Sequence, residues 1–457
     1  MKKCLLIFLL NFPTFISASE LIPELSGTIK ISVEKGTIDA DFQLTSLPKL
    51  NNYLIHLNSG FNIQYFRNEK DGSNYSYEKI YDAKYSEESF GYFFKDKISK
   101  NKFIPDTLQF KYTGKFPVIT DMSKATDEGD SKGNIAFNGK HIRTDGFQTA
   151  WYPILYDIDN DKRYDEVIYD IEVTCLDCKS IYVNGSKPIS STRGRFKRDK
   201  PTSIMLFAGD YNIAEYNRNY YLNTGLSEQQ MSELAKLTSA YINYYEDKLS
   251  IPYGESVTYI ETAPISKYDS WYFVVYPSIV AMTHEEGFTS IEASWFKSFI
   301  AHELAHYYFG TYKKFNSELG DIFTEAFAEY LSLKTTKDLL GNNAYLNRVN
   351  RKLSELENIK FNAFQDIQSE LDYGDRGLYV YTYAPIIWLA IEKEIGQEKM
   401  WRWIKNILKV ENTRTDYKFM LKTLGEVLKN DLKLKLLVEK YFTNSKAIDN
   451  AKALIIQ

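Results

Sequence analysis

Two histidines flank a glutamate near the middle of the chain, at a spacing that suits metal chemistry. His302, Glu303 and His306 form the pattern His-Glu-x-x-His. On a helix, residues four apart lie on the same face, so both imidazoles can bind one tetrahedral metal ion. Glu303 lies one step round the helix and can reach a water on that ion without being a ligand. The chain has only five histidines, so chance rarely produces this spacing, although a surface helix with a histidine pair is the simpler alternative.

A third ligand is expected from a second helix. Glu325 follows His306 after eighteen residues, and residues 310–320 leave room for a turn between two antiparallel helices. Glu325 can then join His302 and His306 on one ion, and such a set leaves the fourth position of zinc to water. The metal lowers the pKa of this water, and Glu303 takes its proton as it attacks a carbonyl carbon. The sequence therefore predicts a hydrolase with one zinc ion per chain.

Sequence signals mark the ends of these two helices. The first is expected to open with a capping box from Thr289 to Glu292 and to close at Gly310, its C′ residue. The second is expected to be capped at Asp321 and to run to about Lys337. Glu329, one turn beyond the third ligand, either accepts a hydrogen bond from a ligand histidine or is an ordinary solvated glutamate.

Apolar periodicity divides the rest of the chain into a β part and a helical part. From residue 20 to 216 apolar and polar residues mostly alternate, which predicts an antiparallel β domain. From 217 to 457 the period is mostly 3.6, with strands expected at 257–261 and 271–282, the second an edge or bulged strand because of Pro277. Helices are predicted at 228–249, 344–356, 385–395, 399–408, 417–429 and 432–442. The fold class is therefore α+β, with domains at 20–216 and 217–457.

Residues 1–19 have the pattern of a secretory signal peptide. Two lysines precede an apolar run, and small residues at 17–19 supply a cleavage site. Asn11 and Pro13 interrupt the run, which argues against a permanent span. We therefore expect a secreted or periplasmic protein without a stable membrane span once this signal is removed. The formal charge of −4 and the lack of a basic block argue against nucleic-acid binding.

Cys175 and Cys178 are the cysteines that remain after removal of the signal peptide. In an oxidising compartment, a local disulfide across a tight turn is expected between them. A zinc ligand pair would lack its second half, and a redox site would lack the βαβ setting that such sites use.

The metal pattern and its surroundings resemble a known family. His302-Glu-Leu-Ala-His306, the eighteen-residue gap and Thr324-Glu-Ala-Phe-Ala328 look like the zinc signature of gluzincin metallopeptidases of the aminopeptidase N (membrane alanyl aminopeptidase) family. Leu249-Ser-Ile-Pro-Tyr-Gly254 is similar to the family's approach to its catalytic core, and the β domain to its saddle-shaped N-terminal domain. The resemblance covers nearly all of the chain after residue 19. It implies a thermolysin-like catalytic domain, mainly helical with a small β-sheet, that acts on peptide or protein substrates.

The resemblance also implies a tyrosine that stabilises the oxyanion of the tetrahedral intermediate. The family places this residue before a helix that ends in Ile-Gly. Counted back from Ile395-Gly396, Tyr381 takes the place, with Tyr383 as the neighbouring alternative. A phenol can donate to an oxyanion without bringing a competing charge, although tyrosines at such positions can also serve only for packing.

One departure from the family concerns the amino terminus of the substrate. The family's aminopeptidases carry Gly-x-Met-Glu-Asn on an edge strand, and its glutamate binds the free α-amine. The equivalent stretch here, 272–276, has neither glutamate nor glycine. Glu261, Glu285 and Glu286 are near in sequence, but none is at a position that assigns it this role. The strand can still pair with an extended peptide through its backbone.

Three functions are compatible with these patterns. The first is a zinc metallopeptidase that is aminopeptidase-like with altered recognition of the terminal amine. The second is a zinc endopeptidase that cuts internal bonds, because no anchor for a terminal amine is visible. The third is a catalytically weak protein that binds peptides or acts at a surface, since a fold does not by itself imply activity. The complete ligand set and Glu303 favour the first two.

Overall fold

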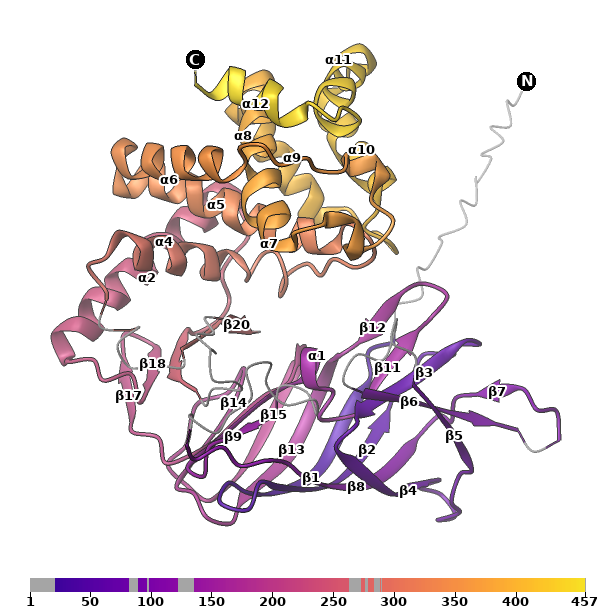
Figure 1. Ribbon diagram of the computed structural model, residues 1–457. Coiled ribbons are helices and arrows are strands. Elements are labelled where there is room, and N and C mark those ends of the chain that lie inside the picture. The colour runs from indigo at the N-terminus through magenta and orange to yellow at the C-terminus, as the bar shows by residue number, and fades with distance from the viewer. Residues whose placement is uncertain are drawn as a thin grey trace, which may run out of the picture.

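Figure 1 shows a β-rich N-terminal part and a helical C-terminal part in the computed structural model of the chain. The structure describes residues 21–81, 89–96, 98–121, 135–262, 273–275, 278–282, 288 and 290–456. The predicted signal peptide at 1–19 lies outside these residues. The α+β class expected from the periodicity is confirmed.

Three sheets form the β-rich part, with the strand orders β15-β13-β1-β2-β8-β4, β12-β11-β3-β6-β5 (β7 beside β6) and β14-β16-β10-β9. Buried and partly exposed residues alternate along all of β13, because successive side chains point to opposite faces of a sheet. The prediction of an antiparallel domain is wrong for β1 and β13, which pair in parallel. The bounds are β1 (Glu24–Ser32), β2 (Thr37–Thr45), β3 (Tyr53–Asn58), β4 (Phe61–Arg67), β5 (Tyr77–Ile80), β6 (Ser89–Lys95), β7 (Lys102–Phe103), β8 (Leu108–Lys115), β9 (Ala136–Phe137), β10 (His141–Asp145), α1 (Gly146–Thr149), β11 (Ile154–Asp157), β12 (Lys162–Tyr164), β13 (Glu166–Cys175), β14 (Ser180–Val183), β15 (Arg193–Ser203) and β16 (Met205–Gly209).

The turn at the end of β13 contains the predicted disulfide. Cys175 and Cys178 are bonded, with their Cα atoms 5.7 Å apart. This separation is within the range that disulfides require, whereas four extended residues would place the ends too far apart. The prediction is confirmed.

A five-stranded sheet, β17-β18-β19-β21-β20, follows in the chain. Its strands are β17 (Ile213–Tyr216), β18 (Asn219–Leu222), β19 (Thr258–Glu261), β20 (Phe273–Val275) and β21 (Ile279–Met282). The prediction of one strand over 271–282 is wrong, because β20 and β21 are two strands that pair antiparallel. Ser278, directly before β21, has φ 56°. β20 is the edge strand, as expected from Pro277, which itself lies outside the described residues. The β17–β18 hairpin spans residue 216, the predicted domain boundary.

Helices make up the rest of the chain, and most match the predictions to within two residues. The first, α2, is capped by Ser227 in a capping box with Gln230. The sequence did not predict α12. Across the described residues, no helix is both long and apolar enough to span a membrane. The bounds away from the metal-binding pattern are α2 (Glu228–Leu249), α6 (Asn342–Glu355), η4 (Phe364–Asp366), η5 (Glu370–Tyr373), α7 (Arg376–Leu378), η6 (Tyr379–Tyr383), α8 (Ala384–Ile395), α9 (Gln397–Lys409), α10 (Tyr417–Leu428), α11 (Asp431–Leu437), η7 (Val438–Phe442) and α12 (Ala447–Ile455).

The helix that carries the histidines, α4 (Ser294–Ala305), is shorter than predicted at both ends. It begins after Ala293, whose side chain cannot cap, and 290–292 form a turn, so the capping-box prediction is wrong; Thr289 itself lies outside the described residues. Its end is also earlier than the predicted Gly310. The last turn tightens, because the N–H of His306 donates to the carbonyl oxygen of Glu303, 3.2 Å away.

The second predicted helix is a continuous segment of three pieces: η2 (Ile322–Ala326), α5 (Phe327–Thr335) and η3 (Thr336–Leu340). η2 and η3 have π-helical hydrogen bonding, and the segment ends at Gly341 with φ 101°. The prediction that Asp321 caps this helix is wrong. Within the described part of the chain its carboxylate makes no capping hydrogen bond, and it lies 2.6 Å from Arg376 Nε instead.

Candidate metal centre

The last turn of α4 and the first turn of the η2–α5 helix lie side by side and face one another. Ser332 donates to the carbonyl oxygen of Ser298 at 2.7 Å, and Tyr245 of α2 donates to that of Ala301 at 2.5 Å. The loop between the two helices is held from the β-rich part, where Asp165 accepts from Lys314 at 2.5 Å. These contacts fix both helices that carry the predicted ligands.

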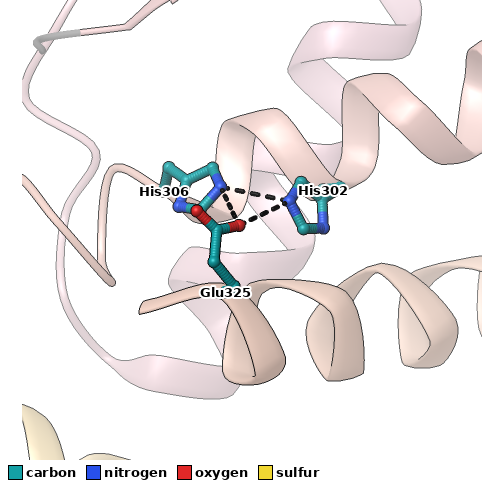
Figure 2. Close-up of side chains that lie close together, drawn as sticks. All are labelled: His302, His306 and Glu325. Atoms are coloured by element: carbon teal, nitrogen blue, oxygen red, sulfur yellow. Dashed lines mark hydrogen bonds and ion pairs between the residues drawn. The ribbon is translucent and has the colours of Figure 1, made fainter. Parts of the chain in front are cut away.

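Figure 2 shows His302 and His306 pointing toward Glu325 from the neighbouring helix. The Nε2 atoms of the two histidines are 3.1 Å apart. Glu325 Oε2 lies 3.4 Å from His302 Nε2 and 3.3 Å from His306 Nε2. The structure thus brings together all three ligands predicted from the sequence, each offering one atom to the same point.

The other nitrogen of each imidazole identifies its tautomer. His302 Nδ1 is 3.1 Å from Glu329 Oε2, and His306 Nδ1 is 3.3 Å from the carbonyl oxygen of Phe309. Both partners are acceptors, so both Nδ1 atoms carry the proton. In the neutral imidazoles the two Nε2 atoms therefore bear lone pairs, which is the form that binds metals.

The three converging atoms fit a divalent cation. Within the described residues, the buried Glu325 Oε2 has no hydrogen-bond partner, although two imidazole nitrogens lie nearby. Three acceptor atoms directed at one point repel each other unless a positive charge lies between them. Two histidine nitrogens and one carboxylate oxygen are also the donor set of many catalytic zinc sites.

The surrounding carboxylates favour positive charge at this point. Burial opposes protonation of His302, yet Glu325 and Glu329 raise the pKa of its imidazole to about 10. Burial likewise opposes charge on Glu325, but His306 and His302 hold the pKa of its carboxyl well below the usual range. The carboxylates therefore favour a positive charge between the two histidines and Glu325.

Glu303 lies in the last turn of α4 between the two histidines and is 7% exposed. Its charge also raises the pKa of both His302 and His306, which indicates that the carboxylate is close to the two rings. Its position therefore agrees with the sequence prediction of a carboxylate near the metal.

Glu329 lies behind His302 and is 6% exposed, so the alternative of a solvated glutamate is wrong. Besides its contact with His302 Nδ1, Glu329 forms ion pairs with two cations. Arg348 Nη2 and Lys352 Nζ each lie 2.7 Å from its Oε1. Burial opposes ionisation, but these two cations hold the pKa of Glu329 well below the usual range. Sequence reasoning missed both cations. Their four-residue spacing on α6 was the available signal, but such spacing is common on solvated helix faces.

The ring of Tyr381 lies 5.8 Å from the ring of His302, whereas Tyr383 is 2% exposed and packs against Phe361 and Phe364. Of the two tyrosines that the sequence offered, Tyr381 is therefore the one beside the metal centre. Burial raises its pKa above the ordinary value, so its hydroxyl keeps its proton and can donate.

Arg376, which the sequence did not predict, lies beside the centre, and its side chain is 47% exposed. We call this the open side of the centre. The guanidinium of Arg376 makes two contacts with Asp321, at 2.6 and 2.7 Å, and is 5.8 Å from the centre of the Tyr381 ring. Its Nη2 is 4.0 Å from Glu325 Oε1. Glu285, Glu286 and both ends of 272–276, the stretch equivalent to the family's amine-binding strand, lie outside the described residues.

Comparison of the sequence with models of protein families finds no match, and comparison with curated proteins finds none either. Solved structures are similar in fold. LTA4 hydrolase from yeast in complex with bestatin has 17% sequence identity over 91% of this chain and a TM-score of 0.63. An M1 zinc metallopeptidase from Deinococcus radiodurans has 12% identity over 93% of this chain and a TM-score of 0.61. A mutant of that enzyme, bound to a Tyr-Ser-Ala substrate, has 12% identity over 92% of this chain and also gives 0.61.

The chain covers 66% of the bestatin-bound yeast protein and 94% of the Deinococcus radiodurans protein. At these identities the similarity shows the fold, and the fold implied by the sequence resemblance is confirmed.

Proposed function

We propose that this chain is a zinc-dependent metallopeptidase that hydrolyses peptide bonds. The observation that supports it most strongly is the convergence of His302 Nε2, His306 Nε2 and Glu325 Oε2 while both Nδ1 protons are directed elsewhere. The similarity in fold to M1 zinc metallopeptidases supports it independently.

Zinc held by His302, His306 and Glu325 would supply a Lewis acid that acidifies water and polarises a substrate carbonyl. Glu303 then accepts the proton of the attacking water as general base and can return it to the leaving amine. Tyr381 donates its phenolic proton to the oxyanion that forms on the carbonyl.

We further propose an aminopeptidase-like mode in which the terminal amine is recognised differently, with an endopeptidase as the alternative. The sequence at 272–276 has no glutamate to bind an α-amine, and β20 is an edge strand with which an extended peptide can pair. A peptide and its N-acetylated twin separate the two modes. Cleavage of the free peptide alone supports the first, and equal cleavage of both supports the second.

Secretion or export to the periplasm is also a proposal. It rests on the signal-peptide pattern at 1–19, and the Cys175–Cys178 disulfide supports an oxidising compartment. Expression of the full chain with N-terminal sequencing of the mature protein tests it. Cleavage after residues 17–19 is expected, and a mature protein that retains residue 1 would contradict it.

A chelation experiment tests the metallopeptidase proposal. A mixed peptide library is incubated with the protein, with the protein after chelation, and with the chelated protein after one equivalent of zinc. Cleavage positions are read by mass spectrometry. We expect chelation to abolish cleavage and zinc to restore it, because the ligands remain in the folded protein. Cleavage that survives complete loss of metal would contradict the proposal.

A further inference from the structure

Lys352 on α6 is a buried ammonium that contacts two parts of the metal centre. Its side chain is 6% exposed, and its Nζ lies 2.7 Å from Glu329 Oε1. The same Nζ donates to the backbone carbonyl oxygen of Tyr381 at 2.6 Å. A lysine ammonium has three donors and no acceptor, so it can serve both oxygens at once.

These contacts form one continuous chain from a metal ligand to the tyrosine. His302 donates through Nδ1 to Glu329, Glu329 accepts from Lys352, and Lys352 donates to Tyr381. Four different elements (α4, α5, α6 and η6) contribute one member each. The ammonium therefore fixes the position of one half of the site relative to the other.

The sequence removes one backbone donor from the carbonyl oxygen of Tyr381, the one that an α-helix would supply. In an α-helix, the carbonyl of residue 381 would accept from the N–H of residue 385. Residue 385 is proline, which has no N–H, and it stands in the first turn of α8. Tyr381 lies in η6, which has π-helical hydrogen bonding, and Lys352 adds a side-chain donor to its carbonyl oxygen.

Arg348, one turn earlier on α6, provides a natural contrast. It donates to Glu329 at 2.7 Å and also to Ser332 and Thr336, at 2.9 and 2.7 Å. All three partners lie on the α5–η3 helix. Arg348 thus supports the carboxylate behind His302, whereas Lys352 supports that carboxylate and the tyrosine together.

We propose that Lys352 is a positioning residue that fixes the position of Tyr381 relative to His302. Its kinetic consequences rest on the proposed peptidase function, but its effect on the position of Tyr381 does not. A purely structural ammonium would neutralise Glu329 and leave the tyrosine unaffected.

The test compares Lys352→Met with Arg348→Met in the full-length, zinc-loaded protein. Each is made in the wild-type background and together with Tyr381→Phe. We expect Lys352→Met to lower kcat about 10- to 100-fold with KM within about twofold, since loss of an outer partner of a metal site has effects of this size. In the Tyr381→Phe background the same change should lower kcat much less, because the group that it positions has lost its hydroxyl. Arg348→Met should lower activity by the same factor in both backgrounds.

A second readout does not depend on turnover. With 3-fluorotyrosine in place of Tyr381, fluorine NMR reports the surroundings of this ring. We expect Lys352→Met to shift or broaden the signal and Arg348→Met to leave it unchanged. Lys352→Met leaves Glu329 paired with Arg348. If it still does not fold, Lys352→Gln, whose shorter amide keeps a donor beside Glu329 without the ammonium, carries the same fluorine measurement.

The outcomes separate the two proposals. An unchanged fluorine signal, or equal kcat losses for Lys352→Met in both tyrosine backgrounds, would overturn the role of Lys352. Absence of hydrolysis by the wild-type protein together with a shifted fluorine signal in Lys352→Met would overturn the peptidase function and leave the positioning role standing.

Discussion

The buried side and the open side of the metal centre use the same chemistry in different surroundings. On the buried side, Glu329 pairs with Arg348 and Lys352, and all three side chains are at most 13% exposed. On the open side, Asp321 pairs with Arg376, whose side chain is 47% exposed. Both are carboxylate–cation pairs within 3 Å, and Asp321 is only 12% exposed, but the cation is removed from solvent only in the first.

Glu325 lies between Asp321 and Glu329 in the chain, and its surroundings differ from theirs. Asp321, Glu325 and Glu329 follow one another at four-residue spacing along one helical segment, so they lie on neighbouring turns. The outer two are each in close contact with a cation from another element. The middle one presents its Oε2 to two imidazole nitrogens, at 3.4 and 3.3 Å. The outer two carboxylates thus face cations, whereas the middle one faces the two imidazoles with which it could hold a metal ion.

The largest effect is expected from the middle carboxylate. Glu325→Gln removes the charge that balances the metal, so zinc affinity should fall by more than about 100-fold, beyond the loss that outer partners cause. Metal analysis of the purified protein after dialysis measures this. Zinc that stays at the wild-type level would remove Glu325 from the ligand set.

Tyr381→Phe removes the phenolic hydroxyl from the ring next to Arg376. Loss of one oxyanion donor should lower kcat about 10²- to 10³-fold, with little change in KM, because the donor acts only on the charge that develops during the reaction. Zinc content should stay at the wild-type level. An unchanged kcat would show that this phenol has no role in turnover.

Glu329→Gln tests the buried side through stability as well as metal binding. It leaves Arg348 and Lys352 buried without their carboxylate, which should lower the free energy of unfolding by about 3 to 5 kcal/mol. Zinc affinity should fall about 10- to 100-fold, because His302 loses its charged acceptor. Denaturant unfolding and metal titration measure the two effects. A stability equal to that of the wild type would contradict the buried network.

Arg376→Gln is the matched change on the open side and should have the smallest effect on stability. Because its guanidinium is half exposed, water screens its pair with Asp321, and the loss should stay within about 1 kcal/mol. The same denaturant series measures it. A loss as large as that of Glu329→Gln would remove the distinction between the two sides.

The sequence was sufficient to predict the parts of the site that follow from local spacing. His302, Glu303 and His306 occupy one helical turn, and Glu325 follows from the length of the connecting loop. Tyr381 came from the family resemblance, and only the structure separated it from Tyr383, because the ring of Tyr381 lies beside His302 whereas Tyr383 packs in the core. The β alternation and most helix bounds were also predictable, because they depend on nearest neighbours along the chain.

Contacts between distant elements were not predictable. Arg348, Lys352 and Arg376 pair with carboxylates on another helix, and a sequence does not show which charges face each other across a fold. The same limit explains the wrong cap at Asp321, since pairing with Arg376 replaced the local interaction that its residue type favours. The strand expected at 271–282 failed because its apolar run conceals a chain reversal.

The most direct test of the central claim is the metal content and turnover of Glu303→Gln, measured on the same preparation. We expect one zinc per chain, as in the wild type, because Glu303 is not a ligand. We also expect hydrolysis to be lowered about 10²- to 10⁴-fold, the usual contribution of a general base. Zinc retained with undiminished hydrolysis would contradict the role of Glu303, and a wild-type protein that holds no zinc would contradict the metal centre itself.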